Sequence, residues 1–127
     1  MEYVKTFEGY NNYKETSWSA KIDGKDVTIT IKDVEDLLKD KEQTKIPVSE
    51  IQDLSIHKDK KDKKTLKRIS DSNLKFPIII SKLDGKYNRI LDGHHRLQKA
   101  INTETKFIKA KVLDLDDAPS KYMKMFM

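Results

Sequence analysis

The residues best suited to chemistry form one consecutive group, Asp92-Gly93-His94-His95-Arg96. The group follows an apolar run and precedes a segment with helical spacing, so we expect a turn that opens a helix. The first N–H groups of a helix lack acceptors, and the aligned peptide dipoles place partial positive charge there. Gly93 allows close approach of a ligand, and the Arg96 guanidinium can meet a phosphate with two parallel hydrogen bonds. The group therefore predicts a phosphate site.

The other side chains of this turn extend the prediction. His94 and His95 add donors around the same point, and Asp92 can accept hydrogen bonds from the loop or hold a magnesium ion beside the phosphates. A zinc site is not expected, because neighbouring helical residues point about 100° apart. His57 is the only other histidine, and the chain has no cysteine for a thiolate ligand or a disulfide.

A basic segment lies before this turn. The chain has 26 Lys+Arg and 21 Asp+Glu residues and a net charge of +5. The segment from His57 to Arg68 holds two acidic residues, Asp59 and Asp62, and the basic residues Lys58, Lys60, Lys61, Lys63, Lys64, Lys67 and Arg68. The net charge of this segment, seven positive less two negative, equals the +5 of the whole chain. Such a stretch attracts nucleic acid or nucleoside phosphates, and the alternative is a solvated helix face that keeps the protein soluble.

The surrounding pattern predicts a mixed α/β (α+β) domain with a small mixed sheet flanked by helices. Strands are expected over residues 25–31, 46–51, 76–81, 87–91 and 107–113, with a type I′ hairpin at Asp84-Gly85. The apolar run at 76–81 is rich in β-branched residues, so this strand is expected to be buried on both faces. Helices are expected after an N-cap at Asp33 to near Lys41, over 59–72, from Gly93 onward, and after a cap at Asp116 or Asp117 with Pro119 in the first turn. The buried face of the helix after Gly93 is expected to include Leu97, Ala100 and Ile101.

The domain organisation expected from these elements is simple. Residues 1–19 are interpreted as an N-terminal aromatic arm, and residues 20–127 as one domain with its core at 46–113. No apolar run approaches the ~18 residues of a membrane span, and the N-terminus lacks the apolar stretch of a secretory signal. We therefore expect a soluble cytoplasmic protein without a membrane partner.

The order and spacing of several motifs resemble the ParB/sulfiredoxin-like superfamily. They are residues 46–48, the basic helix, residues 76–80, the Asp84-Gly85 hairpin and residues 90–97, and the resemblance extends over residues 46–113, about half the chain. In that superfamily the strand, turn and helix bind the phosphates of a nucleotide. The resemblance implies that Gly93, His94, His95 and Arg96 contact ATP, ADP or CTP.

The residues at which this chain differs from the family motifs indicate which activities of the superfamily it could have. Sulfiredoxins carry a catalytic cysteine where this chain has His94, so sulfiredoxin activity is excluded. Partitioning ParB proteins carry a glutamate there and continue into a helix-turn-helix region, which this chain lacks. The free serine kinases share Asp-Gly-His-His-Arg, but the glutamate that acts as their general base has no counterpart near His57. His57 and Asp59 are the alternative bases.

The N-terminus suggests a biological setting. Lys5-Thr6-Phe7-Glu8 resembles the signal of tailed-phage proteins that are packaged into heads, which implies a phage protein in the host cytoplasm or the virion. The alternative is an ordinary aromatic arm.

Three functions follow as hypotheses. The first is an enzyme or sensor that binds a nucleoside phosphate, in which Asp92, His94 and either His57 or Asp59 would serve phosphoryl transfer or hydrolysis. The second is a ParB-like DNA-binding or nuclease module that uses the basic segment. The third is an interaction protein without turnover, with a protein partner or as a homo-oligomer.

Overall fold

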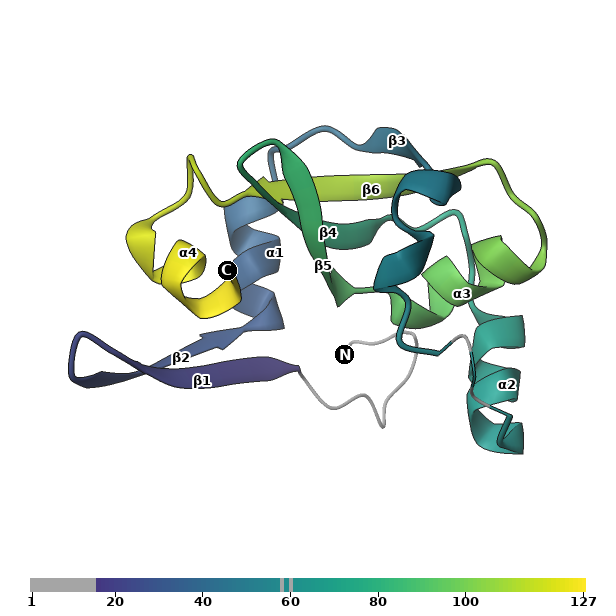
Figure 1. The fold of residues 1–127 in the computed structure, drawn as a ribbon, viewed down its shortest axis with the longest axis horizontal. Coiled ribbons are helices and arrows are strands. Elements are labelled where there is room, and N and C mark those ends of the chain that lie inside the picture. Colours follow the sequence, from purple (N-terminus) through teal and green to yellow (C-terminus); the bar gives the residue numbers. More distant parts are fainter. Residues whose placement is uncertain (1–15, 58, 60) are drawn as a thin grey trace.

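A computed structural model of the chain describes residues 16–57, 59 and 61–127 (Figure 1). The predicted arm as far as residue 15, with its Lys5-Thr6-Phe7-Glu8 motif, and the basic residues Lys58 and Lys60 lie outside the described residues. The described elements are β1 (Ser17–Ile22), β2 (Lys25–Thr30), α1 (Ile31–Leu38), β3 (Thr44–Pro47), the 3₁₀ turns η1 (Val48–Glu50) and η2 (Gln52–Leu54), α2 (Lys63–Asp71), β4 (Ile78–Leu83), β5 (Lys86–Asp92), α3 (His94–Asn102), β6 (Phe107–Asp114) and α4 (Ser120–Phe126).

The central feature is a four-stranded mixed sheet in the order β3-β6-β4-β5. β4 runs parallel to β6, whereas β3 pairs with β6 and β5 pairs with β4 in antiparallel fashion. The predicted α+β fold class is therefore confirmed. β4 lies inside the sheet, and its residues from Ile78 to Ser81 are all buried, as the apolar run predicted.

Helices cover both faces of this sheet, because successive strand residues point to opposite sides. On one face Ile79, Leu91 and Leu113 pack in a cluster with residues of α1, α4 and β2. On the other face Ile78 and Ile80 pack in a second cluster with residues of α3 and η1. Figure 1 shows α1 and α4 at one end of the sheet and α2 and α3 at the other.

A separate two-stranded hairpin, β1–β2, precedes the sheet. Residues 17–19 lie in β1, where Ser17 pairs with Thr30, and are not part of the predicted arm. The sequence of β1 has little alternation, so its pairing depends on β2 beside it. Trp18 docks on the domain, with its ring centroid 4.9 Å from that of Phe126 in an edge-on contact.

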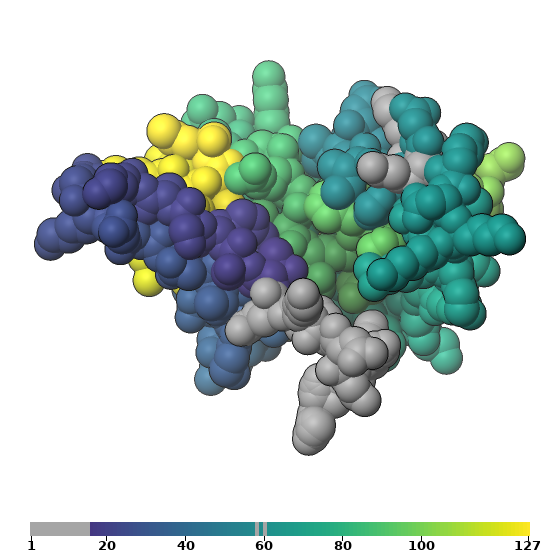
Figure 2. All heavy atoms as spheres, turned by 90° about the horizontal axis from the view of Figure 1, so that it is seen from below, coloured from purple at the N-terminus to yellow at the C-terminus, as the bar shows by residue number. Residues whose placement is uncertain are grey.

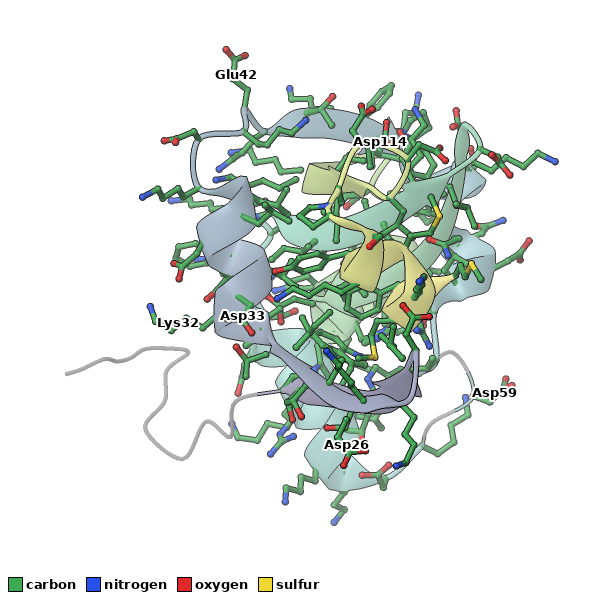
Figure 3. The ribbon with its side chains drawn as sticks, turned by 90° about the vertical axis from the view of Figure 1, so that its left-hand side faces the viewer. Asp26, Lys32, Asp33, Glu42, Asp59 and Asp114 are labelled. Atoms are coloured by element: carbon green, nitrogen blue, oxygen red, sulfur yellow. The ribbon has the colours of Figure 1, made fainter. Side chains whose placement is uncertain are left out.

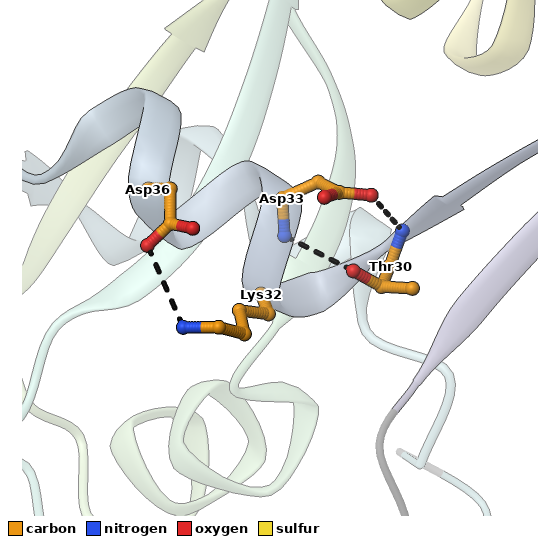
Figure 4. A network of polar contacts seen from close by, with 4 residues as sticks. All are labelled: Thr30, Lys32, Asp33 and Asp36. Carbon is orange, nitrogen blue, oxygen red and sulfur yellow. Dashed lines mark hydrogen bonds and ion pairs between the residues drawn. The ribbon is translucent and has the colours of Figure 1, made fainter.

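The start of α1 differs from the expectation by one turn. Thr30, not Asp33, is the N-cap, and its hydroxyl accepts a hydrogen bond of 3.1 Å from the Asp33 amide. The Asp33 carboxylate accepts one of 2.9 Å from the Thr30 amide, which completes a reciprocal capping box (Figure 4). Hydrogen bonds from the backbone amide and from the side chain of Thr30 to the Asp33 carboxylate hold the pKa of Asp33 below its usual value. The helix ends at Leu38, earlier than the predicted Lys41.

Two strand predictions also need correction. The strand expected at 46–51 ends at Pro47, and the chain continues as 3₁₀ turns. Proline has no N–H for a ladder, and the Val48 amide instead donates to the Lys106 carbonyl at 2.9 Å. Phe76, expected in the next strand, precedes β4 and is 60% exposed.

The remaining helix ends follow from local hydrogen bonds. α2 begins at Lys63 rather than residue 59, because the Asp62 side chain caps it. α4 begins at Ser120 after Pro119 and has no side-chain cap, so the predicted caps are wrong. Asp116 instead accepts a hydrogen bond of 2.9 Å from the Asp84 amide and thereby ties the β4–β5 hairpin to the chain after β6.

Candidate functional site

The turn between β5 and α3 requires glycine. Gly93 adopts φ 96° and ψ 25°, a left-handed conformation that side chains disfavour. A Cβ atom there would lie 2.6 Å from Cγ2 of Ile78, a buried residue of the neighbouring strand β4. The turn is thus packed directly on the sheet, which sets where α3 begins.

The N-terminus of α3 lacks the side-chain cap found in the other long helices. Thr30 caps α1 and Asp62 caps α2, but the N-cap of α3 is Gly93, which has no side chain that could accept such a hydrogen bond. The Leu97 amide donates to the Gly93 carbonyl at 2.9 Å, and the amides before it have no acceptor in the helical pattern. This end of α3 can therefore receive an external acceptor.

The structure brings the three histidines of the chain together. The rings of His57 and His95 stack, with centroids 4.4 Å apart and planes at 19°. His57 also meets His94 edge-on, with centroids 6.0 Å apart. His57 comes from the segment after η2, whereas His94 and His95 begin α3. The sequence had suggested His57 only as one of two alternative bases.

The imidazoles of α3 are neutral at pH 7. Burial, followed by the charges of His57 and Arg68, lowers the pKa of His95 from 6.5 to about 4. Burial also lowers the pKa of His94, with His57 acting in the same direction and the Asp92 carboxylate opposing. A neutral imidazole offers one donor and one acceptor nitrogen. Hydrogen bonding of the His94 ring to the Ile90 backbone also opposes the effect of burial on its pKa.

Arg96 already has two contacts within the protein. Its Nη1 donates to the Pro77 carbonyl at 2.6 Å, and its Nη2 lies 3.7 Å from a carboxylate oxygen of Asp92. Both side chains are largely buried, at 19% exposure for Arg96 and 30% for Asp92. The guanidinium therefore holds the segment before β4 against the turn. Some of its N–H donors are used in these contacts and are not open to a ligand.

The candidate magnesium ligand, Asp92, is not part of a larger metal-binding group among the described residues. Over residues 16–57, 59 and 61–127 no group of three or more histidine, aspartate or glutamate side chains could hold a metal ion. One carboxylate suits Mg²⁺ only where phosphate oxygens and water complete its coordination.

Asp59 is exposed to solvent and has no hydrogen bond or ion pair with the three histidines or with any other described residue. Figure 3 shows it directed outward from the molecule. Of the two alternative bases, His57 is the one that the structure brings to the turn.

The basic segment lies beside the turn, because α2 packs on α3. Its described cations are all exposed: Lys61, Lys63, Lys64, Lys67 and Arg68. Lys67 pairs with Asp71 at 3.1 Å, and Lys99 of α3 donates to the carbonyls of Ser70 and Ser72 at 2.8 and 2.7 Å. Figure 2 shows the teal residues of this segment and purple β1 on opposite sides of the molecule, with green residues between them.

Two buried polar residues near the site, Ser55 and Gln98, are not among the site residues predicted from the sequence. The Ser55 hydroxyl donates to the Gln98 side-chain oxygen at 2.6 Å, and the His57 amide donates to the Ser55 hydroxyl at 3.3 Å. The position of Gln98 next to Leu97 and Ala100, on the face predicted to be buried, was a usable signal. The sequence around Ser55 contains no pattern that would have identified this residue as part of the site.

Other features of the surface lie away from this chemistry. A shallow depression of about 420 Å³ at the opposite end of α3 is lined by Pro47, Ser49, Gln52, Ala100, Ile101, Glu104, Thr105, Lys106 and Phe107. It contains no histidine, so it is distinct from the turn. None of the helices in the described part of the chain is long and apolar enough to cross a membrane.

Comparison of the chain with protein-family models, with curated proteins and with solved structures gave no match. The likeness to the ParB/sulfiredoxin-like superfamily stays a prediction from the motif and its spacing.

Proposed function

We propose that this domain binds a phosphate group of a nucleotide at the N-terminus of α3. The observation that carries the proposal is the start of this helix, which opens at Gly93 without a side-chain cap and places two half-buried histidines in its first turn. Helix N-termini favour anions through their N–H groups and dipole. The two other helices of at least eight residues satisfy the same groups with their own side chains.

The neutral histidines fit this role as hydrogen-bonding groups rather than as fixed positive charges. Phosphate oxygens would accept hydrogen bonds from the backbone amides of the first turn and from imidazole N–H groups. Arg68, whose charge affects His95, adds attraction to the anion. Arg96 contributes its remaining donors while it holds the turn in place.

The family resemblance supplies the ligand class within this proposal, namely ATP, ADP or CTP. Mg²⁺ would arrive with the phosphates and take Asp92 as its protein ligand, at the expense of the ion pair with Arg96. For turnover, His57 is the candidate base because it lies against the other two histidines. Proton acceptance by a neutral imidazole suits the attack of water or a hydroxyl group.

A thermal-shift panel with ATP, ADP and CTP, each with and without Mg²⁺, tests the proposal. At least one nucleotide should raise the Tm of the full chain, because a ligand that binds only the folded state stabilises it. The double variant His94→Ala/His95→Ala should lose the shift. The control variant Lys61→Ala/Lys64→Ala should keep it, since these exposed lysines lie outside the turn. No shift with any nucleotide at millimolar concentration would refute the proposal.

A second candidate function is nucleic-acid binding by α2. It is favoured by the exposed cations of α2 next to the same turn, where Arg68 acts on His95. Fluorescence anisotropy with labelled single- and double-stranded DNA would show affinity falling steeply with salt, because several phosphates are neutralised. The Lys63→Glu/Lys64→Glu variant should bind more weakly. A flat salt response would exclude this function.

A further inference from the structure

Two buried polar side chains connect α3 with the segment that carries His57. Ser55 is 7% exposed and Gln98 is 4% exposed. The Ser55 hydroxyl donates to Oε1 of Gln98 at 2.6 Å, and Nε2 of Gln98 donates to Oδ1 of Asn102 at 2.8 Å. Both ends of the Gln98 amide have partners, so its orientation is fixed on the helix.

The same connection reaches the histidines. The His57 amide donates to the Ser55 hydroxyl at 3.3 Å, and the His57 ring stacks on His95 at 4.4 Å. Gln98 follows His94 by four residues and His95 by three, which places it one turn further along the same side of α3. The helix that supplies two imidazoles is thus hydrogen-bonded to the loop that supplies the third.

Packing alone does not account for this pair. A buried amide and a buried hydroxyl destabilise a protein unless both are hydrogen-bonded, and apolar side chains could fill the same volume. Hydrogen bonds are directional, so a buried polar network with all its groups paired holds those groups in one arrangement, whereas apolar contacts allow several. Here the group held is the backbone of His57.

We propose that Ser55 and Gln98 are positioning residues that hold His57 over the first turn of α3, so that imidazoles from two chain segments contact the ligand. This inference rests on the proposed function, because the ligand is the phosphate group bound there. His57 then becomes a third binding residue, and affinity depends on the loop staying docked on the helix.

Histidine ring resonances of the full-length protein, measured by NMR without ligand, test the positioning step. In Ser55→Ala and in Gln98→Met, the His57 and His95 resonances should move toward those of unstacked imidazoles. Ser19→Ala is the matched control, since Ser19 is exposed in the β1–β2 hairpin and lies 2.9 Å from the Thr28 hydroxyl. Unchanged His57 and His95 resonances in both test variants would overturn the proposal.

Titrations with inorganic phosphate and with ATP test the link to binding. Ser55→Ala and His57→Ala should each weaken affinity by about five- to tenfold, the scale of one hydrogen bond. The double variant should bind no more weakly than His57→Ala alone, because Ser55 acts through His57. Additive losses would contradict the proposal. Absence of binding by the unaltered protein would refute the proposed function, while the ring resonances would still show whether Ser55 and Gln98 hold His57.

Discussion

Three imidazoles are in contact at the start of α3, although only two of them are neighbours in the chain. Arg68 and Arg96 add positive charge around His95, and Asp92 is the acidic residue that acts on His94. Protonation of these rings would therefore bring like charges together in a half-buried place. At the residue scale the cluster is suited to hydrogen bonding near neutral pH and is disfavoured in acid.

The pH dependence of stability follows from the His95 pKa. The folded state holds this pKa at about 4, below the usual 6.5, so between these values the unfolded state binds the proton and the folded state does not. The stability is complete above about pH 6.5 and declines as the pH falls toward 4. Urea unfolding should show a loss of roughly 1–2 kcal/mol over this range, allowing for solvent at a half-buried ring. His95→Gln should reduce that loss, and an equal loss in both proteins would contradict the assignment.

Gly93 provides a second test at the residue scale. Gly93→Ala combines a positive φ with a contact of 2.6 Å to Ile78, and we expect it to destabilise the fold by about 2–4 kcal/mol. Gly85→Ala is the control, because Gly85 also has a positive φ but nothing lies within 4 Å of its Cβ position. That variant should cost only about 1 kcal/mol. Equal urea midpoints for the two variants would show that packing on Ile78 is unimportant.

At the scale of single elements, the helices differ in how their first N–H groups are satisfied. α1 uses a reciprocal capping box, α2 uses Asp62 and α3 uses no side chain. A cap fixes the helix start and contributes to stability, whereas an uncapped end leaves donors for another molecule. Among the three helices of at least eight residues, this contrast distinguishes α3, which bears the candidate site, from α1 and α2.

The capping box of α1 gives a direct prediction. Thr30→Ala removes the hydroxyl that accepts from the Asp33 amide and should destabilise the fold by about 1 kcal/mol. Thr30→Ser keeps that oxygen and should recover most of the loss. Thermal unfolding of the two variants makes the comparison, and the prediction fails if serine and alanine at this position have the same Tm.

At the scale of the whole molecule, two hydrophobic clusters lie on opposite faces of one sheet. Both share β4, which contributes Ile79 to one cluster and Ile78 with Ile80 to the other. The C-terminal helix completes the first cluster through Phe126, which is 1% exposed, contacts Trp18, and accepts a hydrogen bond at its carbonyl from Asn88. The end of the chain thereby joins the hairpin to the sheet.

Substitutions at the C-terminus test this role. Phe126→Ala should destabilise the protein by about 3–5 kcal/mol, because it removes a fully buried aromatic side chain. Met127→Ala is the neighbouring control, with a residue that is 73% exposed, and should change stability by less than about 0.5 kcal/mol. Urea unfolding of both variants measures the two changes in the free energy of unfolding. A small effect of Phe126→Ala would mean that α4 is peripheral to the fold.

Local patterns in the sequence determined the elements with strong signals. The apolar run before Ser81 predicted a strand buried on both faces, Asp84-Gly85 predicted a tight hairpin with positive φ at both residues, and Gly93 predicted the start of α3. Each depends on backbone conformation or side-chain periodicity over a few residues, so a single chain is sufficient to reveal it.

Only the tertiary structure decided which of the candidate residues share a site. In the folded chain the ring of His57 stacks on that of His95. The Arg96 guanidinium contacts Pro77 and Asp92, and Asp59 is exposed. The tertiary structure also revealed Ser55 and Gln98, whose hydrogen bond spans 43 residues of sequence. Such contacts depend on how the loop after η2 and α3 pack over the same face of the sheet. No local spacing encodes that arrangement, so the sequence predicted an anion-binding turn but not the three-histidine site built around it.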